Sequence, residues 1–498
     1  MQRSITHTIL AAFTVVAFTA CSGSGAGPGS PSNPFPTGAP PQTSGAKVLN
    51  TIVGIGDSLT AGEESDGLVG QTVPNPLFPA TSIQPQIHAT QTFGWWADMF
   101  NAVYGANAAN ARLPLIKAPG IGTFLVIATA GGFTSFQTSC TGLNAFAFGT
   151  ASAALTATRV SPSSIPWDLG VPGQMVHEAL YQTGPQGPCQ AVSVAPGSLF
   201  GAETTNFWPV LGNFNGLSQV QAARSLSPTL TTVWLGANDL LKYAVSGGQF
   251  GPTPVSSIQS DLTTIVQTMQ QAGSQVAIAN LPDVLKTPLF IPITNVPAQA
   301  TDPLPVTIVT LSGLPIGNAL TIANGVIGAN NLTVGAYILF NAMPAILAVA
   351  TGGAIPNNLV AQGEALTATT AASVQSLNTS YNTAIQTVAT NNGAAFVDIH
   401  ALFVQAALPG GVPVNPGICC TLTPFGGLTS WDMLHPSYTG YALIANAWIS
   451  AINTKFSTAI PQVNVQTQYL QDPYAPGSPV FMMDYVRHYY NPNNHPSF

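Results

Sequence analysis

The chain has 498 residues, only 5% of them charged, and a formal net charge of -7. Ordinary soluble domains carry roughly 25% charged residues. Uncharged polar side chains must therefore form most of the hydrophilic surface of this protein. Ten Lys and Arg residues in all cannot form the basic stripe that nucleic-acid binding needs, so we expect no nucleic-acid partner. A hydrophobic fraction of 46% excludes charged disorder. Pro, Gly, Asn or Thr interrupts nearly every apolar run, which excludes a protein with several membrane spans.

Residues 1–20 are predicted to be a secretory signal peptide. Arg3 precedes an apolar stretch that starts at Ile9, and the stretch is too short to span a membrane. Cys21 follows two small residues in a pattern that resembles a bacterial lipobox, which implies a lipid on Cys21. The alternative is ordinary cleavage of the signal peptide, with Cys21 left unmodified. Residues 21–46 form a Gly/Pro/Ser-rich tether, semi-extended at about 3 Å per residue. We expect an exported protein of the cell envelope, anchored to the membrane through Cys21 and facing the periplasm or the exterior.

Four further cysteines remain in the body: Cys140, Cys189, Cys419 and Cys420. An even number in an exported protein favours two disulfides among three possible connectivities, although a vicinal Cys419–Cys420 bridge is strained. The four lack the Cys/His spacing of a zinc site. We therefore expect disulfides and no metal.

The body alternates strand-like and helical patterns. Apolar runs that end in Gly, Asn or Asp lie at 48–55, 231–235, 276–280 and 394–399, and helical patterns lie between them, as at 256–271 and 366–390. This alternation predicts an α/β fold: a three-layer α/β/α sandwich with a central, mainly parallel sheet. In such sheets reactive groups collect where the strands end.

Long segments rich in Pro, Gly and Thr interrupt the pattern at about 67–166 and 287–363. Loops of this length are usually functional walls or lids, so we interpret both as loop insertions in a domain that covers 47–455. Within the second insertion, the apolar run 332–350 nearly reaches membrane-spanning length, but Asn341 and Pro344 interrupt it, so we expect a buried or lid helix. Residues 456–498 are aromatic and Pro-rich and are expected to form a C-terminal strap over the domain.

Two short motifs carry the residue types of serine hydrolysis. Gly-Asp-Ser-Leu at 56–59 follows a strand, which predicts that Ser58 lies on an exposed strand-to-helix turn. Thr60 occupies the place of the last Gly in G-x-S-x-G, which disfavours an α/β-hydrolase elbow. Asp432 stands three residues before His435, so its carboxylate can fold back and hydrogen-bond one ring nitrogen while the other faces a serine.

Two other motifs offer neutral donors for an oxyanion. The strand at 231–235 leads into Gly-Ala-Asn-Asp, and the Asn238 amide can donate to a developing negative charge. Residues 169–174 contain Gly170 and Gly173 just before a helix, and either could present a backbone N–H.

Taken in chain order, the motifs around Ser58, Gly173, Asn238 and His435 resemble those of the SGNH (GDSL) hydrolase superfamily, which has a flavodoxin-like α/β/α fold. The resemblance covers about 47–455, including flanks such as Ala-Asn-Leu-Pro-Asp-Val at 279–284, but not the two insertions. It implies a carboxylic ester hydrolase that works through an acyl-enzyme, needs no cofactor, and acts on an acyl ester of lipid or carbohydrate. The implied roles are nucleophile for Ser58, base for His435, orientation of that base by Asp432, and oxyanion donation by the Ser58 and Gly173 N–H groups and the Asn238 amide. Asp168 stands where the family often has Asn, which keeps Gly170 open as the donor.

Several alternatives accompany this interpretation. The same fold hosts polysaccharide deacetylases, and a surface binding module could keep the fold without turnover. His177 is expected in packing or solvent, and Asp57 and Asp239 are expected to brace their turns. Asp398 and His400 are expected to be structural, because a metal site needs a third ligand. With so few cations, few ion pairs are lost on acidification, so we expect stability to depend weakly on pH in the carboxylate range.

Overall fold

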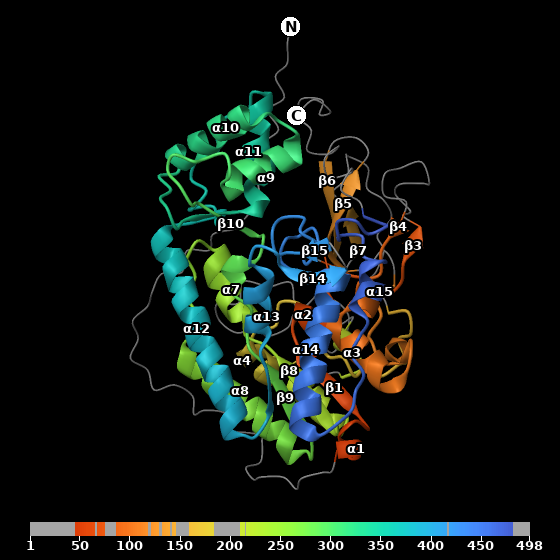
Figure 1. The fold of residues 1–498 in the computed structure, drawn as a ribbon. Coiled ribbons are helices and arrows are strands. Elements are labelled where there is room, and N and C mark those ends of the chain that lie inside the picture. Colours follow the sequence, from red (N-terminus) through yellow and green to blue (C-terminus); the bar gives the residue numbers. More distant parts are fainter. Residues whose placement is uncertain are drawn as a thin grey trace. The chain divides into compact units, whose positions relative to one another are not determined.

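The four strand-like runs lie side by side in one parallel sheet. In the computed structural model the order is β1 (Ile52–Gly56), β8 (Leu230–Trp234), β9 (Gln275–Ala279) and β13 (Ala395–Val397). Figure 1 labels the first three of these strands. An extended segment at 167–171 continues the sheet beside β1, where the Gly54 N–H donates to the Trp167 carbonyl over 2.8 Å. The predicted parallel sheet is confirmed. Its first strand begins at Ile52 and not at residue 48, because Gly45–Val48 form a helical turn, α1.

The structure describes residues 45–64, 67–74, 86–117, 121–128, 132–139, 142–145, 159–183, 210–214, 216–415 and 418–481. The predicted signal peptide, Cys21 and most of the tether lie outside these residues, as do Cys140 and Cys189. The lipidation and disulfide predictions therefore rest on the sequence alone. Among the described residues, no helix has the length and apolar character needed to cross a membrane.

Helices cover both faces of the sheet, as a three-layer sandwich requires. One face carries α3 (Trp95–Tyr104) and α14 (Tyr438–Phe456), which pack on each other (Figure 1). The other face carries α4 (Val176–Tyr181), α6 (Gln219–Ser225), α8 (Val255–Gln271) and α12 (Ala368–Asn391). The last two are the helices that the sequence predicts at 256–271 and 366–390.

Alternating strand residues build the core beneath α3 and α14. Successive side chains of a strand point to opposite faces, and on β8 Leu230 and Trp234 belong to this cluster. The rings of Trp95 and Trp448 stack with centroids 4.4 Å apart, and Trp234 meets both edge-on. This buried indole cluster holds α3 and α14 on the sheet. The turns that lead into α2 and α7 begin at the carboxyl ends of β1 and β8.

The segment 287–363, which we call the cap, is a folded unit and not a loop. It contains β10 (Phe290–Pro292), α9 (Pro303–Ser312), α10 (Ile316–Ala329), β11 (Tyr337–Leu339) and α11 (Met343–Ala348), and β11 also pairs with β12 (Ala365–Leu366). The helix expected at 332–350 is wrong: this run is divided among a turn, β11, two 3-10 turns and the short helix α11. Proline permits these helices because α9 and α11 each carry it in the first turn, where no intrahelical N–H is lost.

The segment 67–166 also contains regular structure. Besides α3 it holds an antiparallel sheet in the order β2 (Gly67–Leu68), β5 (Ile121–Ala128), β6 (Gly132–Ser139) and β7 (Gly142–Ala145), and a pair of β3 (Val73–Pro74) with β4 (Gln86–Ile87). The remaining elements are α2 (Ser58–Ala61), α7 (Ala237–Val245), α13 (Ile399–Ala406), β14 (Val412–Asn415), β15 (Ile418–Cys420) and α15 (Val465–Tyr469). In the C-terminal segment Asp472 accepts the Thr439 N–H over 2.8 Å, which ties this segment to the start of α14.

Candidate active site

Ser58 lies where β1 ends and α2 begins. Asp57 is the N-cap of α2, and its Oδ1 accepts the Leu59 N–H over 3.0 Å. The Glu63 N–H closes the turn on the Ser58 carbonyl, also over 3.0 Å. The turn follows a strand at the carboxyl edge of the sheet, as the sequence predicts. The Ser58 side chain is mostly buried and not exposed, because other segments pack around this turn.

Asp432 and His435 form one tight turn just before α14. Asp432 Oδ1 accepts the N–H groups of Leu434 and His435, and Oδ2 lies 2.8 Å from His435 Nδ1. Met433 adopts a left-handed conformation, with φ of 63°, which lets the chain reverse between them. The carboxylate therefore sets the ring orientation and leaves Nε2 as the nitrogen that can serve a hydroxyl.

The Asp432 carboxyl is held ionised despite its position. Burial raises the pKa of Asp432, but the neighbouring His435 and its own hydrogen bonds to this turn outweigh burial, so the net shift is downward. An ionised carboxylate beside Nδ1 stabilises the imidazolium that forms when His435 accepts a proton.

The serine turn and the histidine turn are neighbours. The Tyr441 hydroxyl, in the first turn of α14, donates to the Glu63 carbonyl over 2.6 Å. Burial raises the pKa values of both Asp57 and Glu63. The nearby charge of His435 lowers them, but by less than burial raises them. The two predicted halves of a catalytic apparatus come from opposite ends of the domain sequence, and the fold brings them together at one edge of the sheet.

Asn238 joins the serine turn to the segment around Gly173. Its Nδ2 donates to the Gln174 carbonyl over 3.1 Å and lies 3.4 Å from Asp57 Oδ2. The adjacent Asp239 accepts the Val176 N–H over 3.0 Å. The Asp239 carboxylate therefore holds this neighbouring segment and the Thr253 hydroxyl, and not its own turn as the sequence predicts. The long second contact of Nδ2 is weak, so that N–H is suited to donate to a bound oxyanion.

The structure separates the roles of Gly170 and Gly173. The Gly170 N–H donates to Asp168 Oδ1 over 2.9 Å, so it is engaged within its own loop. A Cβ at Gly170 would lie 2.4 Å from the Ala61 nitrogen, and the absence of a side chain lets this edge segment approach α2. Gly173 has φ of 85°, and none of the described residues accepts its N–H. This geometry favours Gly173 as the backbone donor.

Sequence reasoning did not foresee how many buried acids surround the site. Burial raises the pKa of Asp57 to about 7 and that of Asp168 to about 8, against partly compensating hydrogen bonds from Leu59 and Gly170. Glu63 is buried next to His435, and its pKa is also raised by burial. The only sequence signal for Asp57 was its place before Ser58. Glu63 had none, because the charged groups near its carboxyl, His435 and Asp432, are distant in the sequence.

The remaining polar candidates take structural positions. His177 pairs with Asp261 at 2.9 Å, and its side chain is 53% exposed. Asp398 caps α13 by accepting the Ala401 N–H and also accepts from the Asn280 amide. Within the described ranges no three His, Cys, Asp or Glu side chains are grouped as a metal site.

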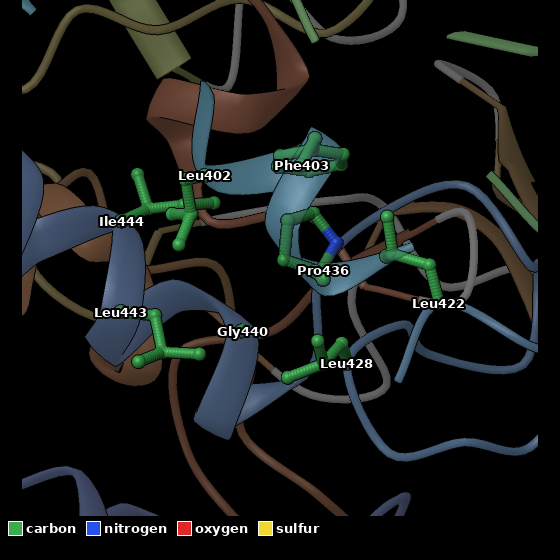
Figure 2. Close-up of a pocket in the computed structure, with 9 residues that line it drawn as sticks. Leu402, Phe403, Leu422, Leu428, Pro436, Gly440, Leu443 and Ile444 are labelled. Atoms are coloured by element: carbon green, nitrogen blue, oxygen red, sulfur yellow. The ribbon is translucent and has the colours of Figure 1, made fainter. Parts of the chain in front are cut away.

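An apolar pocket lies beside the histidine turn. Pro436 lines it, with Leu402 and Phe403 from α13 and with Leu443 and Ile444 from α14 (Figure 2). Its empty volume is about 260 Å³, part of it open to solvent. The lining includes none of the candidate site residues, so the pocket adjoins the site without containing it.

Most of the chain matches one protein family. The model of the family described as GDSL-like Lipase/Acylhydrolase matches residues 52–448, a range that contains all the candidate residues from Ser58 to His435. Searches of the curated proteins and of the solved structures return no match.

Proposed function

The chain belongs to the GDSL-like lipase/acylhydrolase family, and from this premise we propose that it is a carboxylic ester hydrolase, an esterase or lipase, with Ser58 as its nucleophile. The observation that carries the proposal is the pairing of Asp432 with His435 Nδ1 at 2.8 Å in a turn that adjoins the serine turn. A buried carboxylate on one ring nitrogen prepares the other to accept a proton from a hydroxyl.

The reaction proceeds in two halves. Ser58 Oγ attacks the acyl carbonyl and passes its proton to His435, and the N–H groups of Ser58 and Gly173 and the Asn238 amide hold the oxyanion. His435 then protonates the departing alkoxide, and an acyl group remains on Ser58. Water, deprotonated by His435, attacks this ester, releases the acid and restores the serine.

Replacement of the nucleophile tests the proposal. We expect purified Ser58→Ala to lose hydrolysis of p-nitrophenyl butyrate by a factor of about 10³ or more, because the covalent route is removed. Ser260→Ala on α8 serves as the matched control and should keep the wild-type rate. A Ser58→Ala protein that turns over at the wild-type rate would show that the nucleophile is wrong.

Two other functions remain open to measurement. A series of p-nitrophenyl esters from acetyl to palmitoyl, with acetylated xylan alongside, separates them: activity confined to acetyl groups would identify a polysaccharide deacetylase. A folded protein that no fluorophosphonate probe labels would be a binding module without turnover.

We also propose that the protein is exported and carries a lipid on Cys21, on the sequence pattern alone. Mass spectrometry of the N-terminal peptide from the cell envelope should find a diacylated Cys21 as the first residue. An unmodified peptide, or one that begins elsewhere, would reject the anchor. Peptide mapping without reduction would show which of Cys140, Cys189, Cys419 and Cys420 are paired.

A further inference from the structure

The cap exposes no charged side chain. Asp302 is the only charged residue in 287–363, and it is 6% exposed. Its carboxylate is engaged inside the cap, where it accepts from the Asn295 amide over 2.7 Å and from the Gln299 N–H over 2.7 Å. A folded unit of this length with no charge at its surface is unusual, because soluble surfaces are normally rich in Lys, Glu, Asp and Arg.

The same unit exposes large apolar side chains. Val306 on α9 is 44% exposed, Ile355 is 42% exposed and Val334 is 58% exposed. Ile355 lies against Gly325 of α10, and α9 packs along the same helix. The interior of the cap is already filled by its own buried cluster, which includes Ile308, Val326 and Ile346. The exposed residues are therefore additional to the core, and exposed apolar groups rimmed by polar ones mark interaction surfaces.

We propose that the cap docks on a lipid surface without net charge. Binding at such a surface scales with the apolar area that enters it. The cap has no exposed ion to dehydrate on entry, which removes the largest cost of insertion. It also has no Lys or Arg to attract anionic headgroups. Both properties match an uncharged or zwitterionic surface and not an anionic one.

The cap is also joined to the histidine turn. The Leu289 N–H donates to the Met433 carbonyl over 2.9 Å, and Trp431 and Met433 belong to the buried cluster of the cap. A cap seated on lipid is therefore in direct contact with the Asp432–His435 turn. The inference goes beyond ester hydrolysis, and it can be tested without it.

Sedimentation with phosphatidylcholine vesicles tests the docking surface. The full chain carries Cys21→Ser, so that no lipid can be attached there, and any contribution of the N-terminal residues is common to every variant. The test variant is Val306→Asp with Ile355→Asp. The matched control is Val404→Asp with Leu408→Asp, whose side chains outside the cap are 43% and 56% exposed.

We expect the parent chain to bind the vesicles, the cap variant to lose at least about tenfold in partition coefficient, and the control to stay within about twofold. Exchange of about a fifth of the lipid for phosphatidylglycerol, or a rise in salt from about 0.02 to about 0.5 M, should change binding by less than about twofold.

Several results would overturn the inference. They are a parent chain that binds no vesicles, an equal loss in the control, binding that depends on anionic lipid, or a parent chain that self-associates through the cap without binding vesicles. Hydrolysis of soluble p-nitrophenyl acetate checks the fold of every variant. If none of the chains hydrolyses it, ester hydrolysis fails as a function while the vesicle result still decides the docking surface.

Discussion

Both carboxylate oxygens of Asp432 are occupied in the turn that carries His435. Asp432→Asn keeps the size of the side chain but presents a neutral amide to Nδ1, which favours the wrong tautomer. We expect kcat to fall by about 10⁴. Asp398→Asn is the control, because Asp398 also caps a turn but lies in no motif of the site. Steady-state kinetics on p-nitrophenyl butyrate measure both, and a loss below about tenfold in Asp432→Asn would remove Asp432 from the mechanism.

Asn238 has both a proposed catalytic contact and structural ones. Asn238→Ala should lower kcat by about 10²–10³, because one oxyanion donor is lost. It should also cost about 1–3 kcal/mol of unfolding free energy, since the buried Gln174 carbonyl loses its donor. Kinetics and thermal unfolding together separate the two effects. An unchanged kcat in a destabilised protein would make Asn238 purely structural.

For single residues of the site, the sequence predicts contacts between near neighbours in the chain but not contacts between distant ones. The Asp432–His435 pairing follows from a separation of three residues, so it is visible in the sequence. The contacts of Asn238 with Gln174 and Asp57 join residues 64 and 181 positions apart, and only the fold brings them together. For the same reason the sequence could not choose between Gly170 and Gly173.

Among the elements, the extended segment at 167–171 approaches α2 closely because Gly170 has no side chain. Gly170→Ala would bring a Cβ within 2.4 Å of the Ala61 nitrogen, so the segment or α2 must shift. We expect a loss of about 1–3 kcal/mol in unfolding free energy and a lower kcat, because α2 begins at Ser58.

Gly317→Ala on α10 is the control for that substitution. A Cβ there meets nothing within 4 Å, and alanine in a helix should stabilise the protein by about 0.4–1 kcal/mol. Chemical denaturation measures both variants. Equal effects of the two substitutions would contradict the close approach at Gly170.

The cap shows where element prediction from sequence fails. Its helices have proline at or next to their first residue, and α10 carries Gly, Asn and Thr, so composition suggests a loop. Their buried faces form only when they pack on one another, on β10 and β11, and on residues such as Trp431 outside the cap. The parallel sheet was predictable because its strands are buried on both faces and appear as short apolar runs.

Over the whole molecule, most of the acids that the structure describes are buried. Burial raises the pKa of Asp239 and of Asp472 to about 6, that of Asp57 to about 7 and that of Asp168 to about 8. It also raises the pKa values of Glu63, Glu64 and Asp98. The fold thus leaves fewer acids in contact with water than the composition alone implies.

Because these acids are buried, we expect the stability of the fold to fall as pH rises, a direction that the composition alone did not indicate. Unfolded carboxyls titrate near pH 4, so between about pH 4 and 8 the folded chain binds more protons, and its stability is lost as pH rises through the folded pKa values. His88, whose pKa is lowered by burial, opposes this trend, but the raised acids outnumber it. Asp302 and Asp432, whose pKa values are lowered, affect stability only below about pH 4.

We therefore expect a higher Tm at about pH 5 than at about pH 8. Asp168→Asn should flatten the upper part of this dependence, because one titrating group is removed. Calorimetry at a series of pH values measures the trend. A Tm that falls steadily from about pH 8 to about pH 5 would contradict it.

Trapping the acyl-enzyme tests most directly whether Ser58 is the nucleophile. The wild-type protein is mixed with a p-nitrophenyl ester, quenched in acid during turnover and digested, and its peptides are analysed by mass spectrometry. We expect a single acyl group on Ser58, which accumulates further in Asn238→Ala only if deacylation slows more than acylation. An acyl group on any other residue, or turnover with no acylated peptide in a fully mapped digest, would contradict it.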